Sequence, residues 1–257
     1  MKRAALLTLM LSLAIVFYAF LVEPFWIQVT EQEIGGQVTV PLKIAHITDL
    51  HLKQFGRFEV RILSAIELWG PDLIVVTGDS IDDQDNIEYA RQFFLRLRSP
   101  LGTWMVRGNW ENWAPVDDEK SFWQSVNVHF IVNEKVKVRE DVEILGFDDE
   151  LSGKPDRSIT ATEVVPFHLC LFHSPVFFDS VANRCDLALA GHTHGGQIWL
   201  PLMGPLWVPP GSGNYLAGWY QRQNSRMYVS RGLGSPILRV RFLSRPELHL
   251  VTILNGG

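Results

Sequence analysis

The sequence predicts an α/β fold, a four-layer α/β/β/α sandwich of two mixed sheets that follows an N-terminal transmembrane helix. In the first half, short β-rich runs alternate with amphipathic helical stretches, the pattern of βαβ units and a parallel sheet. In the last third, β-rich runs predominate and add further strands. Helices outside and two sheets inside is the layer order that this succession of elements favours.

The N-terminus predicts a retained membrane anchor. Residues 4–22 form a run of nineteen without a charge, which is just long enough to span a bilayer as a helix. A cleaved signal peptide is the alternative, but its apolar core is usually shorter and small residues precede its cut site, whereas residues 17–22 are mostly bulky. We therefore expect residues 1–35 to be anchor and connector, and residues 36–257 to be the folded domain.

The charges around this run predict its orientation. Lys2 and Arg3 precede it, and Glu23, Glu31 and Glu33 follow it. Because basic residues stay on the cytoplasmic side, the domain is expected outside the cytoplasm.

The expected elements follow the βαβ order. Leu73–Thr77 is fully apolar, as in a strand that is buried on both faces. Asp85 is the expected N-cap of the second helix. The expected strands are 40–48, 73–77, 103–107, 128–132, 135–138, 142–147, 168–172, 186–190, 227–230, 237–242 and 247–254, and the expected helices are 58–69 and 87–97. We expect 128–132, 135–138 and 142–147 to form a small antiparallel group.

Composition narrows the possible partners. The chain has 257 residues, 47% of them hydrophobic, and no linker-like stretch, so we expect one domain after the anchor. A net charge of −5 argues against a general nucleic-acid surface. Cys170 and Cys185 lie in or beside apolar runs, so we expect two buried, inert thiols and no disulfide.

Five motifs end apolar runs and carry the chemistry. They are Asp49-Leu50-His51, Gly78-Asp79, Gly108-Asn109, His173 and Gly191-His192-Thr193-His194. Taken singly, an Asp-x-His is usually a loop cap, a Gly-Asp a turn and an isolated histidine a core residue. Together, in this order and at strand ends, they predict a two-metal centre that hydrolyses phosphate esters. Oxygen and imidazole ligands without a thiolate suit Mn, with Fe or Zn as alternatives.

These motifs resemble those of the calcineurin-like metallophosphoesterase superfamily, and the resemblance runs from about Ile44 to Leu254. Residues 48–51, 191–197 and 228–232 resemble a bacterial, membrane-associated or exported branch of phosphodiesterases. The resemblance implies that one metal binds Asp49, His51, Asp79 and His194, and that the other binds Asp79, Asn109, His173 and His192. It also implies that water held between the metals attacks phosphorus in line.

One position departs from the superfamily pattern, in which Gly-Asn is followed by a general-acid His. Here the residue is Trp110, whose indole N–H does not transfer a proton at neutral pH. Either the leaving group is already a weak base and needs no proton, as when a pyrophosphate is split and a phosphate monoester departs, or activity has been lost and the site only binds metal. The complete ligand set favours the first interpretation. Glu111 keeps the acidic position of the motif.

The substitution suggests a substrate. Enzymes that cleave UDP-2,3-diacylglucosamine in lipid A synthesis also resemble this chain in lacking that His. The apolar, proline-rich loop 198–210 would suit an acylated substrate, although it could equally pack over the sheet edge. Against this, a nucleotide-linked substrate is cytoplasmic, whereas the domain is expected outside.

Three hypotheses follow. The first is a membrane-anchored hydrolase of phosphodiester or pyrophosphate bonds, in its sharpest form one that cleaves UDP-2,3-diacylglucosamine or a similar lipid-linked pyrophosphate. The second is a broad exported phosphodiesterase, and the third is a membrane-tethered, non-catalytic metal-binding scaffold. Candidate substrate contacts are Arg107, Trp110 and Arg231, with Arg57 and Trp113 as further candidates. For each arginine, a solvated surface charge is the alternative.

Overall fold

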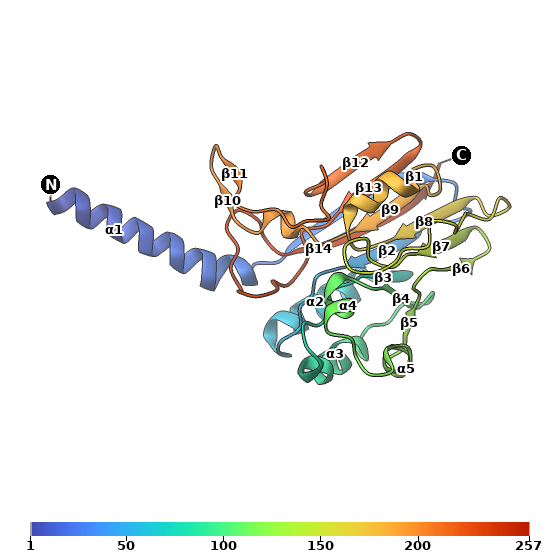
Figure 1. Ribbon diagram of the computed structural model, residues 1–257, viewed down its shortest axis with the longest axis horizontal. Coiled ribbons are helices and arrows are strands. Elements are labelled where there is room, and N and C mark those ends of the chain that lie inside the picture. Colours follow the sequence, from blue (N-terminus) through green and yellow to red (C-terminus); the bar gives the residue numbers. More distant parts are fainter. Residues whose placement is uncertain (1, 257) are drawn as a thin grey trace.

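The computed structural model describes residues 2–256 and begins with a long apolar helical segment. Helix α1 (Lys2–Phe17) continues through a π-helical turn, η1 (Tyr18–Val22), into a 3₁₀ turn, η2 (Glu23–Phe25). The segment projects away from the rest of the molecule (Figure 1), and α1 has no buried residue. By length and composition it is a candidate membrane-spanning helix, as the uncharged run predicts.

Two six-stranded mixed sheets form the body of the molecule. Their strand orders are β1-β14-β2-β3-β4-β5 and β12-β13-β9-β8-β7-β6. The strands of the first sheet are β1 (Gln28–Gly36), β2 (Leu42–Ile47), β3 (Leu73–Thr77), β4 (Thr103–Val106), β5 (Val128–Phe130) and β14 (Glu247–Asn255). Those of the second are β6 (Glu134–Arg139), β7 (Val142–Gly146), β8 (Phe167–Leu171), β9 (Leu187–Ala190), β12 (Gly218–Arg222) and β13 (Ser225–Val229).

Apolar side chains fill three layers around these sheets. Helices α2 (Arg57–Trp69), α3 (Ile87–Phe94) and α5 (Glu119–Ser125) cover the outer face of the first sheet. A second core lies between the two sheets, and a third covers the outer face of the second sheet, where α6 (Phe178–Val181) packs. The predicted four-layer order is confirmed, but the last helical layer is a four-residue helix together with loops.

Three local predictions are wrong. Residues 128–130 do not pair with their neighbours in sequence, because β5 lies parallel to β4 in the first sheet while β6 and β7 form an antiparallel edge of the second. Asp85 does not cap α3, since its own N–H donates to Asp83 in the turn η3 (Gln84–Asn86). Residues 237–242 form no strand and contribute a single bridge between Ile198 and Phe242.

The segment expected as a connector also contributes a strand. Residues 28–36 form β1, which pairs in parallel with β14 along its full length. Every second residue of β1 is exposed, as befits an edge strand. Its many polar residues hide the β pattern in the sequence.

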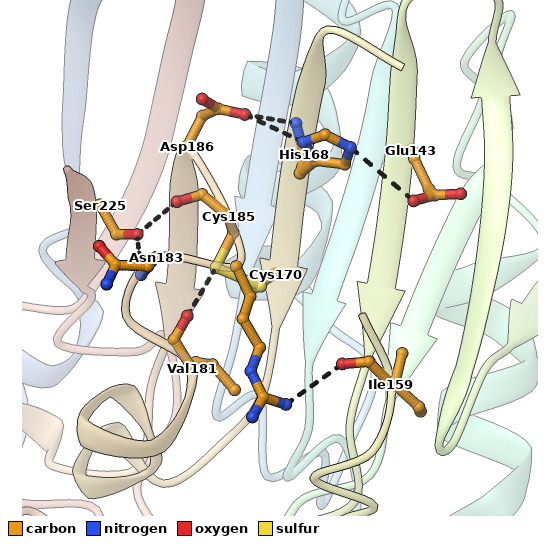
Figure 2. The surroundings of a disulfide bond; sticks show 10 residues. Glu143, Ile159, His168, Cys170, Val181, Asn183, Cys185, Asp186 and Ser225 are labelled. Atoms are coloured by element: carbon orange, nitrogen blue, oxygen red, sulfur yellow. Dashed lines mark hydrogen bonds and ion pairs between the residues drawn. A yellow bond between two sulfur atoms is a disulfide. The ribbon is translucent and has the colours of Figure 1, made fainter. Parts of the chain in front are cut away.

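The two cysteines form a disulfide, contrary to the prediction of free thiols (Figure 2). Cys170 lies on β8 and Cys185 lies two residues before β9, with a Cα–Cα distance of 5.7 Å. The Asp186 N–H donates to the His168 carbonyl and holds the two segments side by side. This pairing of parallel strands is tertiary, so the spacing of the cysteines alone did not reveal it.

Candidate metal centre

All five motifs lie at the carboxyl ends of strands. β2 leads to Asp49 and His51, and β3 leads to Asp79. The remaining candidates follow β4 (Asn109), β8 (His173) and β9 (His192 and His194). All seven side chains are buried. Because β2, β3 and β4 run parallel, as do β8 and β9, their ends meet at one edge of the sandwich.

The backbone at this edge is strained. Five of the seven residues adopt left-handed φ angles between 43° and 73°, namely Asp49, His51, Asp79, His192 and His194. A non-glycine residue in this region costs of order 1–3 kcal/mol and persists only where its surroundings hold it. Such strain is typical of a functional site, where it aims side chains at one point.

The glycines of the motifs allow the strand ends to touch. A Cβ on Gly108 would lie 2.3 Å from Asp79 Oδ1, and a Cβ on Gly191 would lie 2.0 Å from Thr48 Oγ1. Both distances are far below contact, so only glycine fits at either position.

The candidates form two groups. In the first, His194 Nε2 lies 3.3 Å from His51 Nε2 and 3.4 Å from Asp49 Oδ1. In the second, Asn109 Oδ1 lies 3.0 Å from His173 Nε2 and 2.9 Å from His192 Nδ1. These are ligand atoms that converge from separate loops on two points.

Asp79 lies between the groups. Its Oδ2 is 3.1 Å from His173 Nε2 and 3.7 Å from His51 Nε2. Its Oδ1 accepts a hydrogen bond of 2.9 Å from the Trp110 N–H, which fixes the rotation of the carboxylate. A carboxylate in this position could bridge two cations.

The far side of three of the four rings fits a metal ligand. His173 Nδ1–H donates to the Thr77 carbonyl at 2.7 Å, His192 Nε2–H donates to the Pro210 carbonyl at 2.6 Å, and His51 Nδ1–H donates to Asp82. The opposite nitrogen of each ring therefore faces the centre as an acceptor, the tautomer that metal binding requires. Unprotonated nitrogens that face one another across 3.2 Å, as those of His173 and His192 would, repel unless a cation or a proton lies between them.

The carboxylates and histidines of the centre shift one another's pKa values. Burial would lower the pKa of His173, but Asp79 and Asp49 outweigh it and raise that pKa well above its ordinary value. For Asp49, burial acts upward, and His194, His173 and His51 together bring its pKa below the usual range. Without a cation, protons hold these groups together, and metal binding releases such protons.

Glu111 holds two of the loops together. Its buried carboxylate accepts the N–H groups of Asp79, Ser80 and Gly108 at 2.7–2.9 Å. Burial, with Asp79 contributing, raises the pKa of Glu111 to about 7. This explains why an acidic residue follows the Gly-Asn motif even where its histidine neighbour is replaced.

A cavity of about 600 Å³ opens over the centre. Trp110 and Trp113 form part of its wall, and the Trp110 ring lies 6.0 Å from the His51 ring. The rest of the wall is mainly apolar and includes Leu151, Leu206, Trp207, Pro209, Ile237 and Leu238. Among the described residues that line this cavity, Asp79, His192 and His194 are the only ones with an ionisable side chain.

The three arginines do not line this cavity. Arg107 pairs with Glu119 at 2.6 Å and with Asp148 at 3.6 Å, and Arg231 pairs with Glu247 at 3.2 Å. Arg57 is exposed at the start of α2. Of the candidate substrate contacts, only the two tryptophans lie on the cavity wall.

Two site residues carry no signal in the sequence. Asp82 orients His51 and pairs with Lys53 at 2.9 Å. Arg241 is buried, lies 3.4 Å from His194 Nδ1 and donates to the carbonyls of Gly232 and Gly234. Asp82 lies three residues after Asp79, and only that proximity could have suggested it.

Comparison with known proteins places the chain in a family. Residues 42–196, more than half of the chain, match the calcineurin-like phosphoesterase family. An uncharacterized metallophosphoesterase of Bacillus subtilis, YkuE, is 32% identical, with 92% of this chain and 88% of the relative covered. The phosphodiesterase YaeI of Escherichia coli is 27% identical, with 92% of each covered.

A solved structure is similar in fold alone. GAP50, the anchor in the inner membrane complex of Plasmodium, has a TM-score of 0.50 and 9% identity, with 85% of this chain and 83% of that chain covered. The family match and the relatives, together with buried side chains that could hold a metal ion, show that the chain is a metal-dependent phosphoester hydrolase of the calcineurin-like phosphoesterase family.

Proposed function

We propose that the chain is a membrane-anchored hydrolase of phosphodiester or pyrophosphate bonds that works with two manganese ions. One ion would bind Asp49, His51, Asp79 and His194, and the other Asp79, Asn109, His173 and His192. The position of Asp79 Oδ2 between the two groups is the single observation that best supports this arrangement. When bound, the ions would lower the pKa of water and stabilise charge on the phosphoryl oxygens.

The chain's own residues explain the choice of bond. Trp110 stands where a general acid is expected, and no described lysine, arginine or tyrosine lines the cavity. A substrate whose leaving group is already a weak base, such as a phosphate monoester or a phenolate, needs no proton donor. The cavity wall would exclude water from the remaining faces of the substrate.

Two observations bear on the substrate and the compartment. The mainly apolar cavity supports an acylated substrate, in its sharpest form UDP-2,3-diacylglucosamine or a similar lipid-linked pyrophosphate. The Cys170–Cys185 disulfide, with Lys2 and Arg3 before the anchor, supports an exported domain. An exported domain favours the second candidate, a broad phosphodiesterase outside the cytoplasm.

A substrate panel tests the proposal. Purified full-length protein with manganese is given bis-p-nitrophenyl phosphate, p-nitrophenyl phosphate, an alkyl phosphate monoester and a UDP-linked acylated sugar. We expect turnover of the diester or the pyrophosphate well above that of the alkyl monoester, whose alkoxide leaving group needs a proton. Preferential hydrolysis of the alkyl monoester would contradict the role given to Trp110.

Two ligand variants separate an enzyme from a scaffold. Asn109→Ala and His194→Ala should abolish nearly all hydrolysis, whereas His129→Ala, which alters a histidine stacked on Trp104, should not. A metal-binding scaffold would show no turnover in the first place and would keep its cellular role in both ligand variants.

A further inference from the structure

An exposed apolar surface lies beside the candidate metal centre. It is formed by the hairpin of β10 (Trp199–Leu200) and β11 (Gly204–Pro205), by the residues that follow this hairpin, and by the segments on either side of Phe242. We call it the apolar rim, and its residues are Trp199, Leu202, Met203, Leu206, Trp207, Ile237, Leu238 and Leu243. Leu202, Met203 and Ile237 are at least 80% exposed. Water-soluble surfaces seldom expose a contiguous group of this kind without a partner.

The residues of the apolar rim carry no charge, although Arg239, Arg241 and Arg245 flank Leu238 and Leu243 in the sequence. Residues 195–218 and 232–238 contain no aspartate, glutamate, lysine or arginine. Arg239 pairs with Glu59, and Arg241 is buried. Arg245 packs on the ring of Trp26. The exposed hairpin tip of the rim is therefore free of the groups that would resist entry into an apolar phase.

Backbone hydrogen bonds tie the rim to the end of the anchor. The Trp199 N–H donates to the Phe242 carbonyl at 2.8 Å, and the next residue back, Arg241, donates its N–H to the Ala19 carbonyl at 2.9 Å. The Phe242 ring lies 6.2 Å from the Tyr18 ring. The hairpin thus lies where the helical segment meets the body of the molecule (Figure 1).

Glu23 fixes this junction. Its carboxylate is fully buried and accepts the N–H groups of Leu243 and Ser244 at 2.9 and 2.6 Å. Trp26, which follows the apolar segment, is half exposed, as is typical of a side chain at a membrane–water interface. The anchor would therefore hold the rim at the bilayer surface.

The rim also borders the cavity over the metal centre. Leu206, Trp207, Ile237 and Leu238 belong to the wall of the cavity that reaches Asp79 and His192. Any apolar phase that covers the rim would thus meet the mouth of that cavity.

We propose that the apolar rim inserts into the lipid bilayer beside the anchor and opens the cavity to substrates embedded in that bilayer. The substrate class is a phosphodiester or pyrophosphate that carries a long alkyl or acyl chain. This proposal rests on the proposed function for its chemistry, whereas the insertion itself is a separate physical claim. A second copy of the chain or a soluble protein is a less favoured occupant, because the surface is continuous with a segment suited to a membrane.

Labelling at the hairpin tip tests insertion. Because Cys170 and Cys185 are bonded to one another, a single introduced cysteine is the only free thiol among the described residues. Leu202→Cys is labelled with an environment-sensitive fluorophore in full-length protein reconstituted into vesicles of phosphatidylethanolamine and phosphatidylglycerol. Val164→Cys is the control, because Val164 is 88% exposed and precedes the amino end of β8, away from the rim.

We expect lipids with nitroxide-bearing acyl chains to quench the Leu202→Cys label and to leave the Val164→Cys label unaffected. Equal quenching at the two positions would overturn the proposal. If the fluorescence of the Leu202→Cys label changes with the density of protein in the vesicle and not with the quencher lipid, the proposal is overturned in favour of contact with a second copy of the chain.

Two substrates with one leaving group test the consequence. Bis-p-nitrophenyl phosphate is soluble, whereas p-nitrophenyl hexadecyl phosphate lies in the vesicle. The double variant Leu202→Glu/Met203→Glu should lose about tenfold or more of its turnover of the second, because burying a carboxylate in a bilayer is costly. The double variant should keep its turnover of bis-p-nitrophenyl phosphate, and the control Val164→Glu should keep its turnover of both substrates.

Equal loss on the two substrates, or no loss on either, would overturn the lipid-access claim. If the unaltered protein hydrolyses neither substrate, the proposed function fails, and the quenching result still decides the insertion.

Discussion

At the scale of single residues, His51 depends on a neighbour that no motif marks. Its Nδ1–H donates to Asp82, and Lys53 pairs with the same carboxylate. Burial acts to raise the pKa of Asp82, but His51 and Lys53 outweigh it and lower that pKa. Asp82 is therefore ionised and holds the ring with Nε2 toward the centre.

Asp82→Asn should weaken the binding of one metal ion by about 10–100-fold, the usual effect of losing such a partner. The neutral amide orients the ring less strongly and no longer raises the basicity of its Nε2. Isothermal titration calorimetry of metal-free protein with manganese measures the change in metal affinity. Asp85→Asn, the same substitution at an exposed position three residues along, is the control, and equal affinities in the two variants would contradict this role.

Trp110→His should extend activity toward poor leaving groups. The indole occupies the place of the expected general acid, 6.0 Å from the His51 ring, so an imidazole there could donate a proton to a departing alkoxide. General acid catalysis contributes about 100-fold or more when well placed. Steady-state kcat on an alkyl phosphate monoester should rise, with Trp113→His as control. An unchanged kcat would show that another group supplies the proton or that none is needed.

The sequence predicted all seven converging side chains, from Asp49 to His194, because their motifs follow strands whose ends must meet. It did not predict the ion pairs that occupy Arg107 and Arg231, since their acidic partners are distant in the chain. It also did not predict that the Glu111 carboxylate accepts backbone N–H groups from two loops. Hydrogen bonds to the backbone of another loop have no periodicity that a sequence can display.

At the scale of elements, strands with apolar runs were predicted well and edge strands poorly. β3 and the start of β4 were placed because they are buried on both faces. β1 and β12 were not predicted, because these edge strands carry many polar residues and their sequences lack a clear alternation of apolar and polar side chains. β5 was predicted to pair with the strands that follow it in sequence, but it pairs with β4. The packing of Val128 and Phe130 in the core of the first sheet determines this pairing, and local turns do not.

The disulfide between β8 and the start of β9 should contribute measurably to stability. Its loop spans 15 residues, for which the chain-entropy estimate is about 3 kcal/mol. The double variant Cys170→Ala/Cys185→Ala should therefore unfold at lower temperature. Thermal unfolding followed by circular dichroism, with and without a reductant, measures this.

Reductant should lower the unfolding midpoint of the unaltered protein and leave that of the double variant unchanged. A midpoint of the unaltered protein that does not respond to reductant under unfolding conditions would contradict a stabilising disulfide.

At the scale of the whole molecule, the two sheets gather ligands that neither sheet holds alone. The first sheet supplies Asp49, His51, Asp79 and Asn109, and the second supplies His173, His192 and His194. The sequence could predict this sandwich from the order of its elements. It could not predict how the anchor docks, because the contact of Glu23 with Leu243 and Ser244 joins residues more than two hundred positions apart.

Anomalous diffraction from manganese in crystals of the full-length protein tests the central claim most directly. Two peaks roughly 3.5–4 Å apart, as in other two-metal sites, should flank the Asp79 carboxylate. One should lie among Asp49, His51 and His194, and the other among Asn109, His173 and His192. A single peak, or peaks that leave Asp79 without a metal contact, would contradict the account.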